Sequence, residues 1–65
     1  MEMEPKYSMN DIVYFTNEKG NYCCGVVIGI YNVGYCVVYD IEINDDYLGY
    51  VVKRGVDEKM MSVKK

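Results

Sequence analysis

The stretch that decides the fold is 22-YCCGVVIGIYNVGYCVVYDIEI-43, two long runs of β-branched and aromatic residues on either side of Asn32-Val33-Gly34. Valine, isoleucine and tyrosine favour the pleated, half-buried surface of a strand. Asparagine and glycine in a short connection favour a tight hairpin. The sequence therefore predicts two antiparallel strands, near residues 22–31 and 35–43.

Alternation along these strands predicts which side chains face the core. The second strand carries Asp40 and Glu42 on one face, so the opposite face is the predicted core face because it avoids burying two carboxylates. That predicted core face consists of Tyr35, Val37, Tyr39, Ile41 and Ile43. In the first strand Gly25 and Gly29 share a face, which lets the strand coil and other groups approach closely.

Working outward, the same composition predicts three further strands, near residues 11–16, 47–53 and 60–63. We expect Gly55 to end the fourth strand, and a 3-10 turn to follow within residues 56–60 with Asp57 near its start. The prediction is an all-β fold of five strands with almost no α-helix. A flexible tail, residues 1–6, precedes a single domain at residues 7–65.

The segment Met9-Asn10-Asp11-Ile12-Val13-Tyr14-Phe15 resembles the opening strand of SH3-like small barrels of the Tudor and KOW type, which often begin Gly-Asp-x-Val. Asn10 stands where glycine is usual, and asparagine also visits left-handed backbone conformations. The resemblance implies a small five-stranded SH3-like barrel with a short 3-10 turn before the last strand. Such barrels act as peptide binders, nucleic-acid binders, subunits and inhibitors, so the resemblance does not decide the function.

Composition and charge exclude several classes of function. The chain has 65 residues and a formal net charge of −3, which argues against general nucleic-acid binding because such affinity comes from neutralising phosphates. No apolar run approaches the roughly 20 residues that span a bilayer. The acidic start lacks the pattern of a secretory signal. We therefore expect a cytoplasmic protein without a membrane partner, in the host cytoplasm if the protein is viral.

Catalytic and metal-binding patterns are weak. Zinc sites need four nitrogen or sulfur ligands, whereas Cys23 and Cys24 point to opposite faces of a strand and only Cys36 could join them. We interpret the cysteines as small, reduced core residues. The acidic residues around 40–46 are interpreted as a solvated turn, and the chain has no His. The prediction is a protein that is not an enzyme and has no cofactor and no metal.

The eight tyrosines are the most informative feature, because a small core accommodates only two or three of them. Exposed tyrosines are typical of interfaces, although they could also simply replace other strand-forming residues. The predicted partner- or ligand-binding residues are Tyr39, Tyr47, Tyr50, Lys53 and Arg54. Tyr50 and Arg54 share one face of their strand and Tyr47 and Lys53 the other, and we favour the pair Tyr50 and Arg54.

The leading hypothesis is a non-enzymatic binding protein that inhibits a host defence protein by direct contact. Many Asn, Ile, Lys and Tyr residues with no Ala indicate AT-rich codons, and with the small size they favour a viral or mobile-element accessory factor. One alternative is an oligomeric sponge for a nucleotide-like signalling ligand, and another is a structural or assembly subunit. We also expect a homo-oligomer, because the sheet has edges to cover.

Overall fold

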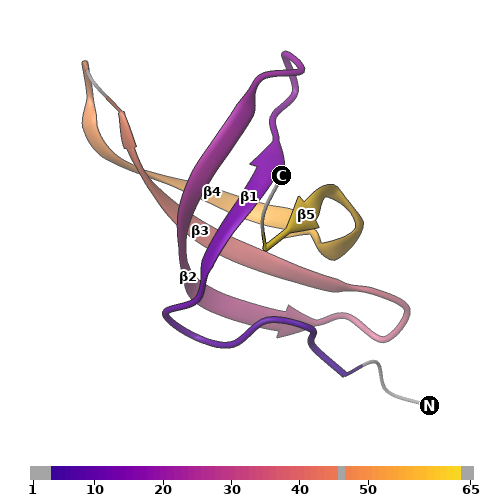
Figure 1. Ribbon diagram of the computed structural model, residues 1–65. Coiled ribbons are helices and arrows are strands. Elements are labelled where there is room, and N and C mark those ends of the chain that lie inside the picture. Colours follow the sequence, from indigo (N-terminus) through magenta and orange to yellow (C-terminus); the bar gives the residue numbers. More distant parts are fainter. Residues whose placement is uncertain (1–3, 46, 64–65) are drawn as a thin grey trace.

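A computed structural model describes residues 4–45 and 47–63 of the chain, and in these ranges every regular element is a strand apart from one 3-10 turn (Figure 1). The all-β prediction is therefore confirmed. The elements are β1 (Ile12–Thr16), β2 (Tyr22–Asn32), β3 (Val37–Asp45), β4 (Gly49–Asp57), η1 (Glu58–Met60) and β5 (Met61–Ser62).

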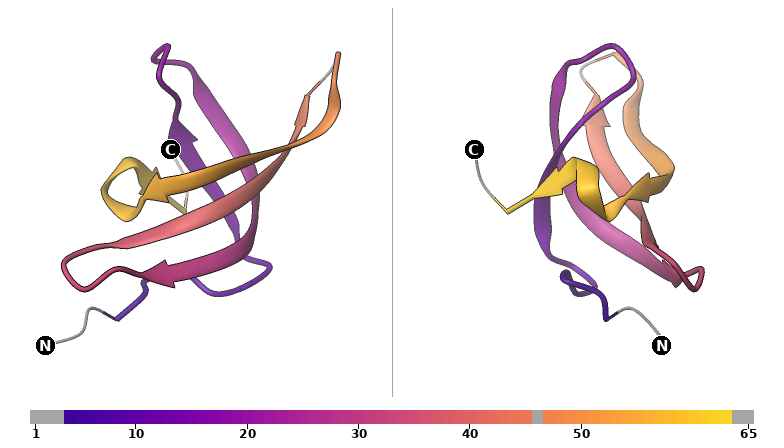
Figure 2. Two further views of the ribbon diagram at one scale, coloured as in Figure 1. Left: turned by 180° about the vertical axis from the view of Figure 1, so that it is seen from behind. Right: turned by 90° about the vertical axis from the view of Figure 1, so that its right-hand side faces the viewer.

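The five strands form one antiparallel sheet in the order β4-β3-β2-β1-β5. The sheet is strongly twisted, and the β3–β4 hairpin extends away from the other strands (Figure 2). The molecule is accordingly elongated, with extents of 41 × 20 × 18 Å. In the described part of the chain no ladder joins β4 to β5, so the sheet is open along these two edges and the predicted closure into a barrel is not seen.

Two predicted turns form where the sequence places them. Gly34 has a φ of 96° in the β2–β3 turn, where its N–H donates to the Asn32 side chain at 2.9 Å. The Asp57 side chain caps η1 by accepting from the Lys59 N–H at 2.9 Å. Asn10 adopts a left-handed conformation, φ 74°, which asparagine tolerates better than most residues.

A β-bulge bends β2 against β3. Val27 lies opposite Ile41, but Gly29 lies opposite Asp40, so Ile28 is an extra residue on β2. A bulge inverts the alternation of side chains along the rest of its strand. This explains why strict alternation does not describe the whole of β2.

A second bulge lies across β3 from the first. The register of β3 and β4 shifts between Tyr39 and Ile41, so Arg54 and Gly55 both lie opposite Asp40. Gly55 has a φ of 67° within this bulge, and β4 continues to Asp57. The prediction that Gly55 ends the fourth strand is therefore wrong, because the left-handed glycine forms a bulge rather than a strand end.

The core consists of Tyr7, Val13, Phe15, Val27, Val37, Tyr39, Ile41 and Met61. The predicted inward direction of Val37, Tyr39 and Ile41 is confirmed. Tyr35 is 84% exposed, because it lies in the turn before β3, so its placement in the core is wrong. Asp40 is buried, contrary to prediction, because the two bulges converge on it.

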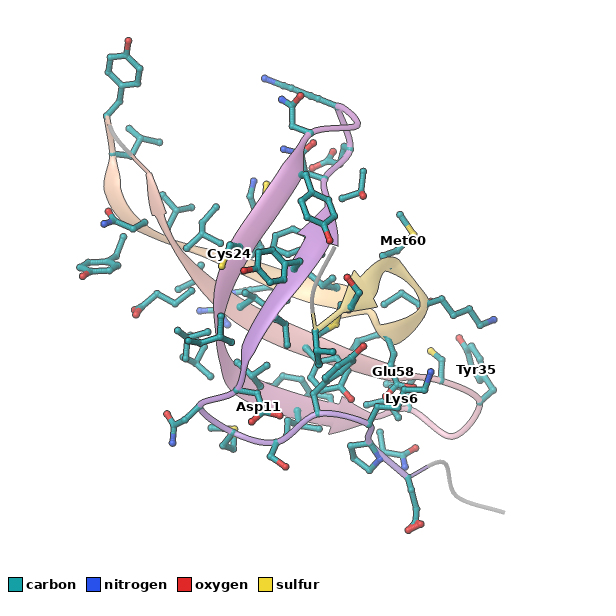
Figure 3. All side chains as sticks on the ribbon, viewed as in Figure 1. Lys6, Asp11, Cys24, Tyr35, Glu58 and Met60 are labelled. Atoms are coloured by element: carbon teal, nitrogen blue, oxygen red, sulfur yellow. The ribbon has the colours of Figure 1, made fainter. Side chains whose placement is uncertain are left out.

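The N-terminal segment packs onto the end of the sheet. Tyr7 is buried, and its hydroxyl donates to the Met61 carbonyl at 3.2 Å. Residues 1–3 of the predicted tail lie outside the described residues. At the other end of that tail, the Lys6 backbone N–H donates to Glu58 at 2.9 Å, and these two residues meet beside η1 (Figure 3).

Candidate functional site

The structure separates the predicted site residues into three places. Tyr39 lies in the core with no exposed surface. Its hydroxyl donates to Glu58 Oε2 at 2.6 Å and accepts from the Tyr7 N–H at 3.4 Å. Burial and the hydrogen bond to Glu58 raise the pKa of Tyr39 to about 12. The two hydrogen bonds of Tyr39 therefore hold the N-terminal segment and η1 against the core, and its side chain does not reach the outer surface.

Tyr47 and Tyr50 lie on the β3–β4 hairpin, at the end of the molecule that projects from the sheet (Figure 2). Tyr47 is 97% exposed and Tyr50 73%. Leu48 and Val52, which are not among the predicted site residues, are 74% and 37% exposed on the same hairpin. The apolar run Tyr47–Val52 at a turn between two strands is the signal that could have indicated them. We call Tyr47, Leu48, Tyr50 and Val52 the apolar arm.

Arg54 lies on β4 at the bulge, next to the buried carboxylate of Asp40. The Arg54 guanidinium is 3.5 Å from Asp40 Oδ2, and its side chain is 78% exposed. The same carboxylate accepts from the Tyr31 hydroxyl at 3.0 Å and from the Gly55 N–H at 3.2 Å. Most of the donors of Arg54 therefore face solvent, while Asp40 holds the bulge in place.

The favoured pair, Tyr50 and Arg54, faces the outer side of β4. Residues 50, 52 and 54 are exposed, whereas 51 and 53 are only partly so, which is the alternation that the prediction used. Arg54 lies four residues after Tyr50, a distance of about 13 Å along the strand. A partner that contacts both must therefore be an extended surface, larger than one aromatic ring.

Lys53 lies on the opposite face of β4 and lines a cleft at the open seam of the sheet. The cleft has two hollows, of about 370 and 340 Å³, and both are lined by Asn17, Glu18 and Lys53. The larger hollow runs between the end of β1 and β4, and Phe15, Val56 and Met60 supply its apolar wall. Its charges are mixed: Lys53 and Arg54 against Glu18 and Asp57.

The cysteines differ in their surroundings. Cys24 is exposed, and Cys23 and Cys36 are half-buried, so none of these free thiols is a fully buried core residue. The interpretation of Cys24 as a core residue is wrong, because the core-facing residues of this part of β2 are its neighbours Cys23 and Gly25. Within residues 4–45 and 47–63, no group of three or more Cys, Asp or Glu side chains is arranged to hold a metal ion.

Over the described ranges the structure has no helix long and apolar enough to cross a membrane. The site thus consists of an apolar arm, an exposed arginine beside a buried carboxylate, and a cleft of mixed charge. Comparison of the chain with models of protein families, with curated proteins and with solved structures finds no match.

Proposed function

We propose that this chain is a non-enzymatic binding protein that uses the outer face of the β3–β4 hairpin to contact a partner protein. The observation that carries the proposal is the apolar arm, in which Tyr47, Leu48 and Tyr50 are each more than 70% exposed. Tyrosine and arginine dominate the binding energy of protein interfaces. Arg54 extends the same face with a planar group that suits a carboxylate.

The concrete form of the proposal is a viral or mobile-element accessory factor that inhibits a host defence protein in the cytoplasm. The excess of residues that AT-rich codons encode, together with the small size, supports this source. The net charge of −3 supports a partner with a basic surface, because charge complementarity steers association. We also propose that the fold is an SH3-like barrel opened along one seam, since β1 lies between β2 and β5 and a 3-10 turn precedes the last strand.

Affinity capture from a host extract tests the proposal, with Tyr50→Ala as the variant and Tyr35→Ala as the matched control. Both tyrosines are highly exposed, but Tyr35 lies in the β2–β3 turn, away from the apolar arm (Figure 3). Removing a hot-spot aromatic residue costs about 2 kcal/mol, near thirtyfold in affinity. We expect Tyr50→Ala to lose the captured partner and Tyr35→Ala to keep it. Equal capture by both variants would refute the assignment.

A second candidate function is a sponge for a nucleotide-like ligand, and the seam cleft favours it. A hollow of about 370 Å³ falls within the range of small-molecule sites. Lys53 and Arg54 supply positive charge for a phosphate, while Val56 and the exposed Met60 supply apolar surface for a base. Cyclic and ADP-ribose-type nucleotides should then raise the melting temperature of the parent but not of Lys53→Ala. A structural subunit without a ligand would respond to neither this test nor the capture.

A further inference from the structure

The outer edge of β4 is the feature from which we argue. β4 lies at the end of the sheet and pairs on one side with β3. Every second residue of an edge strand turns its backbone N–H and C=O outward, and natural edges are protected by proline, bulges or inward-pointing charges. In β4 the bulge begins only at Arg54, and residues 49–54 contain no proline; their charges are Lys53, which lines the seam cleft, and Arg54 at the bulge itself. The edge from Gly49 to Arg54 is therefore regular, and its pairing with another strand depends on where these two charges lie.

We propose that the described edge pairs with the same edge of a second copy, antiparallel, about a two-fold axis through Val52. A two-fold axis perpendicular to the sheet keeps the outer faces of both copies on one side. Such an axis passes midway between one residue and the same residue of the second copy, so that residue lies opposite its own counterpart. Centred on Val52, the register places Tyr50 opposite Arg54 of the second copy. It places Val51 opposite Lys53 on the other face.

Complementarity selects this register over its neighbours. An axis through Lys53 would place two ammonium groups opposite each other, which is unfavourable. A register centred on Val51 would place Arg54 opposite Leu48, so its guanidinium would gain no aromatic contact from the second copy. Centred on Val52, each guanidinium lies beside a tyrosine ring, an arrangement that cation–π attraction stabilises. Because the axis repeats each contact, the dimer contains this pair twice.

The surroundings of Arg54 fit this role. Its contact with Asp40 is 3.5 Å long and its side chain is 78% exposed, so the guanidinium can contact a neighbouring ring without leaving a buried partner. Gly55, with a φ of 67°, ends the regular extended segment immediately after Arg54. The pairing is thereby limited to residues 50–54. It joins two five-stranded sheets edge to edge, with both copies of Tyr50 and Arg54 on one outer face.

The inference does not depend on the proposed host partner, and purified chain alone tests it. Sedimentation equilibrium should show a dimer at tens of micromolar. Val52→Lys places two like charges on the axis, and we expect it to weaken dimerisation at least about fivefold. Val52→Glu should do the same. An equimolar mixture of V52K and V52E chains should restore the dimer, because only a residue on the axis lies opposite its own counterpart.

Ile12→Lys is the matched control, since Ile12 is 62% exposed on β1, which pairs with strands on both sides. This variant should dimerise like the parent. The inference is wrong if the parent is a monomer at tens of micromolar, if V52K dimerises as tightly as the parent, or if the V52K–V52E mixture stays monomeric.

Amide hydrogen exchange gives a measurement that needs no variant. Outward N–H groups in residues 50–54 should gain protection as the parent concentration rises through the dimerisation range, whereas the β2–β3 turn should not change. A dimer in which β4 keeps the exchange rates of the monomer would show that another surface holds the copies together. Protection of β4 only after a different protein is added would show that the edge receives another chain. Either result would overturn the inference.

Discussion

Replacing Asp40 by alanine should destabilise the protein more than any exposed substitution, because this carboxylate holds the bulge of β4. Asp40 is 7% exposed, and its oxygens accept from the Gly55 N–H at 3.2 Å and the Tyr31 hydroxyl at 3.0 Å. Arg54 contributes a third contact at 3.5 Å. Alanine removes all three contacts and leaves the two bulged strands without a common acceptor.

The magnitude follows from the three contacts. A hydrogen bond to a charged group contributes about 1.5–3 kcal/mol, and the Gly55 bond at 3.2 Å belongs at the low end. The hydroxyl of Tyr31, a half-exposed residue, can bond to water instead, so its loss costs about 0.5–1 kcal/mol. Exposed ion pairs contribute about 0–1 kcal/mol, and the 3.5 Å contact of the mostly exposed Arg54 belongs at the low end, about 0–0.5 kcal/mol. We therefore expect Asp40→Ala to lower the free energy of unfolding by about 2–3 kcal/mol.

Urea unfolding followed by circular dichroism measures this loss. A chain of this length has a total stability of about 3–10 kcal/mol, so Asp40→Ala removes a large fraction of it. Arg54→Ala is the control and should cost less than about 0.5 kcal/mol. The reasoning is refuted if Asp40→Ala stays within about 0.5 kcal/mol of the parent. It is equally refuted if Arg54→Ala costs as much, because the stabilisation would then come from the ion pair.

Three further predictions concern the core and the thiols. Folding raises the pKa of Tyr39 from 10.0 to about 12, so the protonated hydroxyl contributes its full share of the folding stability below pH 10 and loses it as the pH rises toward 12. The urea midpoint of the parent should therefore fall between pH 10 and 12 more steeply than that of Tyr39→Phe, and equal slopes would contradict the assignment. Gly25→Ala should lower stability by about 1–3 kcal/mol in the same assay, because its Cβ would lie 2.6 Å from the Glu42 carbonyl oxygen; an unchanged midpoint would count against this close packing. Cys24→Ala should change the unfolding free energy by less than about 0.5 kcal/mol, since the side chain is exposed, and a larger loss would mean that Cys24 is packed.

Alternation predicted the inward side chains of β3, because its period of two holds wherever a strand is regular. Val37, Tyr39 and Ile41 are all fully buried. Alternation could not predict the burial of Asp40, because that depends on extra residues in the strands on both sides. A bulge depends on how two strands pair with each other, and the alternation of residues within one strand does not reveal that pairing.

The candidate site was predictable only in its parts. The capacity of a small core predicted two or three buried tyrosines, and two are buried, Tyr7 and Tyr39; the sequence identified Tyr39 but placed Tyr35 in the core instead of Tyr7. Alternation also placed Tyr50 and Arg54 on a common face, and both are exposed. The sequence could not show that Lys53 and Arg54 line a cleft, because the cleft forms between β4 and the end of β1, which are far apart in the chain.

The bulge at Asp40 links the stability of the sheet to the face that we propose for binding. Because Asp40 accepts from Gly55, the bulge is held immediately after Arg54, which fixes the last residue of the regular edge before it. Without that bond, β4 could shift relative to β3 by one residue, and such a slip moves every following side chain to the other face. Asp40→Ala should therefore weaken β4 pairing between copies as well as folding. Asp40→Asn keeps an acceptor for the Gly55 N–H and should restore both properties together.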